Sequence, residues 1–192
     1  MRHAYDVIST ERVWAGRIIK VRVDQVAMPG GRIGQRDVVE HPGAVGVVVL
    51  DPTDRVLLIR QYRHSIAEVI WEIPAGIRDV AGEDLVHTAQ RELLEEAGLR
   101  AATWHVLCDG LSSPGMSDES YRVFLAREPS EVPAADRPEL TDEELDLDPT
   151  WVDLDEACAW VLAGTIRNSM CGLGVLAAAR ARDVGFRGLR EI

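Results

Sequence analysis

One segment, residues 83–97, constrains the fold most, because it is rich in strong helix formers and contains neither Gly nor Pro. Gly98 follows it directly, as is typical of a helix C-terminus. The expected order of elements is a β-ribbon, mixed strands, this helix, further strands and two last helices. This order predicts an α+β fold, or an α/β/α layer arrangement, rather than a regular series of βαβ units.

The N-terminal part predicts a small antiparallel β-ribbon that is separate from the rest. Residues 17–24 alternate apolar and polar side chains, the period of a half-buried strand. The turn sequence PGG at residues 29–31 allows residues 35–40 to pair back. We therefore expect a ribbon over residues 1–41 and a second domain over 42–192. A short ribbon needs something to pack on, and a second subunit is one candidate.

The second domain is expected to contain several short strands, one long loop and two further helices. The strands are predicted at residues 44–50, 56–61, 67–73, 103–108, 121–126 and 151–154. Residues 128–149 are acidic, contain four prolines and are the best candidate for a long mobile loop. One helix is expected to run to Ala163 with Asp155 as its N-cap, and another over residues 168–182.

The charge balance excludes some classes of partner. The chain has 192 residues, with 21 Lys and Arg against 32 Asp and Glu, a net charge of −11. This charge argues against binding to nucleic acid or to an anionic membrane, although a bound metal ion could still admit an anionic substrate. Three cysteines without a CxxC pair, and a polar N-terminus without a signal peptide, predict a cytoplasmic protein.

Three glutamates of the expected helix form the most informative pattern. Glu92, Glu95 and Glu96 are spaced i, i+3, i+4 and fall within an arc of about 100°. Two such charges 4 Å apart repel by about 1–4 kcal/mol, and no basic residue lies between Glu92 and Gly98 to relieve this. A divalent cation would relieve it, and Mg²⁺ and Mn²⁺ prefer such oxygen ligands. The alternative is a solvated acidic face without a ligand.

This segment resembles the Nudix box, a loop–helix–loop of hydrolases that cleave diphosphates linked to another moiety. Residues 91–99, RELLEEAGL, fit the REUxEExGU end of the box, and Glu83 stands eight positions before Arg91. One departure is that six residues, not five, separate Gly76 from Glu83. The resemblance implies a Nudix α/β/α sandwich with a mixed sheet.

Three flanking sequences resemble the ADP-ribose pyrophosphatase branch of that family. They are IPAG at residues 73–76, RQYR at 60–63 and SPG at 113–115. The branch implies hydrolysis of ADP-ribose to AMP and ribose 5-phosphate. The alternatives are another nucleoside diphosphate sugar or dinucleotide as substrate, or a non-catalytic regulator that binds ADP-ribose.

The resemblance also assigns roles to residues of the box and of the loop after it. It implies Mg²⁺, or Mn²⁺, held by Glu92, Glu95, Glu96 and the carbonyl of Ala75, with Glu95 and Glu96 taking part in catalysis. Glu83 and Arg91 would orient these ligands, or simply pair with each other. Branch relatives draw the catalytic base from the long loop, where Glu143 is favoured here and Glu144 is next.

Further residues are expected to bind the nucleotide substrate. Arg60 and Arg63 are predicted to share one face of a strand and to grip phosphate or ribose. By resemblance, Glu72 would assist, and Ser113, Gly115 and Met116 would contact the ribose-phosphate end. Trp14 is a candidate for stacking on adenine from a partner subunit, because branch relatives are often homodimers that exchange their N-terminal sheets.

Overall fold

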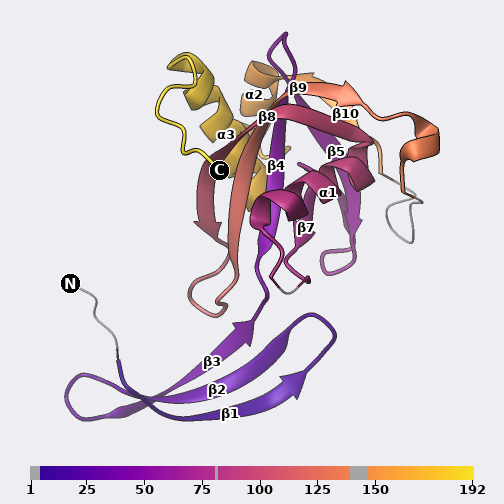
Figure 1. The fold of residues 1–192 in the computed structure, drawn as a ribbon. Helices are drawn as coiled ribbons and strands as arrows, with labels where there is room; N and C mark the ends of the chain where they lie inside the picture. Colours follow the sequence, from indigo (N-terminus) through magenta and orange to yellow (C-terminus); the bar gives the residue numbers. More distant parts are fainter. Residues whose placement is uncertain (1–4, 81, 139–146) are drawn as a thin grey trace. The chain divides into compact units, whose positions relative to one another are not determined.

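The structure is a computed structural model, which describes residues 5–80, 82–138 and 147–192. The chain divides into two compact units (Figure 1). One contains the residues up to Gly43 together with Leu111–Ser120, and the other contains Ala44–Gly110 and Tyr121–Ile192. The inclusion of Leu111–Ser120 in the first unit had no signal in the sequence.

The first unit is built on a three-stranded antiparallel sheet, in the order β1-β2-β3. Its strands are β1 (Val7–Ala15), β2 (Lys20–Ala27) and β3 (Ile33–Glu40). The predicted turn is confirmed, because Gly30 and Gly31 both have positive φ between β2 and β3. The strand predicted at residues 17–24 begins three residues later than expected, and β1 forms a separate strand before it.

The second unit contains a mixed sheet in the order β10-β5-β4-β9-β8, with β6 paired to β5 and β7 paired to β4. The pair of β4 and β9 is parallel, whereas β4 pairs antiparallel with β5 and β7. The strands are β4 (Ala44–Leu50), β5 (Arg55–Arg63), β6 (Glu68–Glu72), β7 (Ala75–Ile77), β8 (Leu99–Leu111), β9 (Ser120–Glu131) and β10 (Thr150–Asp153).

Helices cover both faces of this sheet, and the burial pattern of β4 shows it. Every residue of β4 is buried, as expected for a central strand between two layers. Val45, Val47 and Val49 pack in one cluster with residues of α1 (Leu85–Ala97), and Val48 packs in the other with residues of α3 (Ser169–Asp183). The predicted α+β fold with an α/β/α sandwich and a separate N-terminal sheet is confirmed.

Two local predictions are wrong. Helix α2 (Leu154–Leu162) is capped by Asp153, whose carboxylate accepts hydrogen bonds from the amides of Asp155 and Glu156, so Asp155 is not the N-cap. The acidic segment 128–149 is not a continuous loop, because β9 extends to Glu131 and a 3₁₀ turn follows at Ala134–Asp136.

Within the described ranges, no helix is long and apolar enough to cross a membrane.

Candidate functional site

Helix α1 places the predicted carboxylates. Its N-cap is Asp84, and it ends at Gly98, whose φ of 63° is the left-handed conformation that favours glycine. Val86, Ala89 and Leu93 anchor the helix in the core. Glu92 and Glu96 are also buried, with 9% and 7% of their surface exposed, so they do not lie on a solvated face.

Glu92 and Glu96 pack against strand β7. The backbone N–H of Ala75 donates a hydrogen bond of 2.8 Å to Oε2 of Glu96. At Gly76, a Cβ atom would lie 2.1 Å from Cδ of Glu92, a distance that real Cβ atoms do not show. Gly76 is therefore needed for the close approach of Glu92 to the strand. The extra residue in the loop between Gly76 and Glu83 leaves this contact intact.

Burial dominates the electrostatics of the two glutamates. Desolvation raises the pKa of Glu92 to about 7, although the positive charge of Arg91 opposes this. Desolvation raises the pKa of Glu96 to about 8, against the hydrogen bond from Ala75. Both anions are thus costly without a compensating cation, and cation binding would favour their charged forms.

Arg91 is a cation that lies among these carboxylates. Its Nη1 lies 2.8 Å from Glu92 and 3.0 Å from Glu95, and its Nη2 lies 3.6 Å from Glu83 and 3.7 Å from Asp79. The pair between Arg91 and Glu83, considered from the sequence, is therefore present. The pairing of Asp79 with Arg91 was not anticipated, because no spacing singled it out.

The chemistry of the donors fits a divalent metal ion. Glu92, Glu95 and Glu96 supply hard oxygen ligands, and two of the three carboxylates are buried at an energetic cost that a cation would offset. Among the described residues, no three potential ligands already surround one point. Arg91 holds Glu92 and Glu95 instead, so we infer that it would yield them when a metal binds.

A second polar group lies on β5 and β6. Glu72 is 2% exposed and accepts two hydrogen bonds from Arg63, at 2.9 and 2.5 Å. Arg60 instead lies over the ring of Trp71, 5.5 Å from its centroid. The expectation that Arg60 and Arg63 share a face is wrong. The two residues are three positions apart, and side chains alternate faces along a strand.

The remaining predicted residues belong to the first unit or lie outside the described residues. Ser113, Gly115 and Met116 belong to the first unit, where the carbonyl of Ser113 accepts hydrogen bonds from the amides of Met116 and Ser117. Trp14 also lies in that unit, and 52% of its surface is exposed. Their contact with substrate stays a prediction. The base candidates Glu143 and Glu144 lie outside the described residues.

Comparison with known proteins agrees with the fold and the box. Residues 40–170 match the family model described as NUDIX domain, and residues 5–39 match the model described as nucleoside diphosphate sugar hydrolase N-terminal domain. An ADP-ribose pyrophosphatase of Mycobacterium tuberculosis is 49% identical over 96% of this chain and 87% of its own length.

Two further relatives extend the comparison. A methanol dehydrogenase activator of Bacillus methanolicus is 34% identical over 88% of this chain and 89% of its own length. The crystal structure of an ADP compounds hydrolase covers 95% of this chain and 97% of its own, with a TM-score of 0.77 and 18% identity, which shows a shared fold. From the family model, the near full-length relatives and the three glutamates of the box on α1, we conclude that the chain belongs to the Nudix family.

Proposed function

We propose that this protein hydrolyses ADP-ribose to AMP and ribose 5-phosphate. The observation that carries the chemistry is the buried pair Glu92 and Glu96, which is held against Ala75 and Gly76. The choice of substrate is supported by the ADP-ribose pyrophosphatase that is 49% identical over nearly the whole chain.

Nudix hydrolases generally depend on a divalent metal ion, and this chain offers ligands of the right type. In our proposal Glu92, Glu95, Glu96 and the carbonyl of Ala75 hold Mg²⁺, with Mn²⁺ as the alternative. A metal bound there would neutralise the diphosphate and lower the pKa of the attacking water.

The other side chains have distinct roles in this proposal. Arg91 holds Glu92 and Glu95 in place before the metal binds, at 2.8 and 3.0 Å. Glu143, or else Glu144, takes the proton of the water. Arg63, fixed by its two hydrogen bonds to Glu72, presents a positive charge to the substrate phosphate.

Arg60 has a smaller part in the proposal than the sequence indicated. Arg60 lies on the opposite face of β5 from Arg63, and its guanidinium packs on Trp71 there. We expect Ser113, Gly115 and Met116 to contact the ribose-phosphate end of the substrate, since their backbone and hydroxyl groups are suited to hydrogen bonds with it.

We further propose that the protein is a cytoplasmic homodimer assembled through residues 1–41. Exposed apolar side chains gather on β1, with Val7, Ile8, Val13 and Trp14 each more than half exposed. Such a surface is typical of a protein–protein interface. Light scattering after size-exclusion chromatography would show a monomer if the dimer proposal is wrong.

The proposed cytoplasmic location is supported by the cysteines, because all three are free, in keeping with a reducing compartment.

AMP release from ADP-ribose, measured with and without Mg²⁺, tests the function directly. Glu92→Gln and Glu96→Gln should lose most turnover, whereas Glu68→Gln, on an exposed glutamate paired with Arg167, should retain it. Turnover that is unaffected by a chelator, or by both substitutions in α1, would contradict the proposed metal chemistry.

A second candidate substrate is another nucleoside diphosphate sugar. The observation that favours it is the match of residues 5–39 to a domain of nucleoside diphosphate sugar hydrolases. A panel of nucleotide sugars and dinucleotides, assayed beside ADP-ribose, separates the two by their kcat/KM values. Tight ADP-ribose binding with no turnover across the panel would instead indicate a non-catalytic regulator.

A further inference from the structure

The segment Leu111–Ser120 runs from the last residue of β8 to the first residue of β9, and it folds with the N-terminal sheet rather than with the unit that contains the rest of these strands. The amide of Val39 on β3 donates to the carbonyl of Met116 at 2.8 Å, and the amide of Asp118 donates to the carbonyl of Val39 at 3.1 Å. Beyond β3, the amide of His41 donates to the carboxylate of Asp118 at 2.9 Å. The segment is thereby joined to the end of β3.

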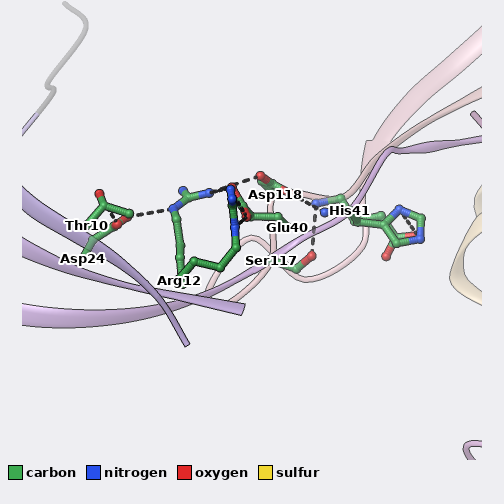
Figure 2. Close-up of polar contacts among 9 residues, drawn as sticks. Thr10, Arg12, Asp24, Glu40, His41, Ser117 and Asp118 are labelled. Atoms are coloured by element: carbon green, nitrogen blue, oxygen red, sulfur yellow. Dashed lines mark hydrogen bonds and ion pairs between the residues drawn. The ribbon is translucent and has the colours of Figure 1, made fainter. Parts of the chain in front are cut away.

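A single guanidinium reinforces this junction. Arg22 on β2 lies 3.1 Å from a carboxylate oxygen of Asp24, 3.0 Å from one of Glu40 and 3.7 Å from one of Asp118. Figure 2 shows Asp118 beside Glu40 and His41, with Thr10 and Asp24 at the other end of the group. Arg22 thus connects the middle of β2, the end of β3 and the segment.

The charges in this group make Arg22 hard to replace. Asp24, Glu40 and Asp118 carry three negative charges, and among the residues that the structure describes, Arg12 is the other cation that forms an ion pair with the group, through its bond to Glu40. Arg22 is three-quarters buried, whereas Arg12 is more than half exposed. Without Arg22, the carboxylates would repel one another, and Asp118 is the one on the segment that can move away.

We propose that Arg22 is a positioning residue, which holds Leu111–Ser120 in the conformation that binds the substrate. This inference rests on the proposed function, through the contacts proposed for Ser113, Gly115 and Met116. The three glutamates on α1 belong to the other unit, so we expect the substitution of Arg22 to leave their chemistry largely unaffected.

The test compares Arg22→Met with Arg12→Met, because Arg12 bonds the same Glu40 but, within the described part of the chain, forms no ion pair with Asp118. Hydrogen exchange in residues 111–120 should become at least about threefold faster in Arg22→Met and stay unchanged in α1. KM for ADP-ribose should rise about fivefold while kcat stays within about twofold, the pattern of lost ground-state binding. Arg22→Lys should restore part of the lost substrate binding, because lysine keeps the positive charge but lacks the planar set of N–H donors of the guanidinium group.

Asp118→Asn provides a second variant if Arg22→Met does not fold. It keeps an oxygen for the amide of His41 but removes the charge that faces Arg22, so we expect a smaller effect in the same direction.

The outcomes separate the inference from the function it rests on. Unchanged exchange in residues 111–120 would overturn the inference whatever the substrate, and so would faster exchange with an unchanged KM. If the parent protein hydrolyses nothing in the panel, the proposed function is wrong, and the exchange measurement alone decides whether Arg22 holds the segment.

Discussion

Gly76→Ala tests whether close contact between β7 and α1 positions the carboxylates that we propose as metal ligands. A Cβ at this position would lie 2.1 Å from Cδ and 2.6 Å from Cγ of Glu92, whereas ordinary contacts begin at 3.4 Å. Because Cγ is also too close, turning the carboxylate alone does not relieve the clash. The Glu92 side chain must move by 3.4 − 2.1 = 1.3 Å.

A displacement of this size is expected to reduce catalysis far more than stability. Moving a catalytic group by about 1 Å can cost about 100-fold in rate, which is about 2.7 kcal/mol. Gly76 does not have positive φ, so alanine is not strained in its backbone. Overpacking costs about 1–3 kcal/mol and is partly offset by the less flexible unfolded chain.

The assay measures kcat/KM for AMP release, Mg²⁺ affinity by calorimetry and the unfolding midpoint. Gly172→Ala is the matched control, because a Cβ there would meet only Val161 at 3.4 Å, an ordinary contact. A folded Gly76→Ala protein with the parent's metal affinity and turnover would refute the positioning of Glu92 by this contact.

Three further predictions concern pH, cysteines and capping. In the metal-free protein, the pKa of Glu96 is about 8 in the folded state and 4.5 in the unfolded state. Between pH 4.5 and pH 8, the folded state therefore holds a proton on Glu96 that the unfolded state lacks. The contribution of this proton to stability is complete below pH 4.5 and is lost as the pH rises through 8. In denaturant titrations at several pH values, the free energy of unfolding of Glu96→Gln should therefore depend less on pH than that of the parent protein. Burial raises the pKa of Cys108 to about 11 and raises that of the deeply buried Cys171 as well. Disulfide reagents at pH 8 should therefore modify both slowly until denaturant is added, and rapid reaction of folded Cys171 would contradict its burial. Asp153→Ala should destabilise the protein by about 1 kcal/mol in chemical denaturation through loss of the α2 cap, whereas Asp155→Ala, tested beside it, should cost less.

Local sequence signals predicted the elements that carry the site. Helix α1 follows from its helix formers and from Gly98, and the grouping of Glu92, Glu95 and Glu96 follows from helical spacing alone. The buried strand β4 follows from its apolar run. These features depend on residues only a few positions apart, so the chain's composition and period determine them.

Other local features were predicted less accurately. The N-cap of α2 is two residues earlier than expected, since Asp153 and Asp155 are both good caps and only the backbone geometry selects between them. Arg60 and Arg63 lie on opposite faces of β5 because they are three positions apart, and the pairing of Arg60 with Trp71 and the bonds of Arg63 to Glu72 agree with this.

The sequence by itself determined the helix, its row of glutamates and most of the strands, because short-range propensity and periodicity encode them. Tertiary structure decided that Glu92 and Glu96 are buried against β7, which sets their pKa values. It also decided that Arg22 meets Asp118, a residue far along the chain. Desolvation and long-range ion pairs depend on which distant segments pack together, and no local pattern specifies that.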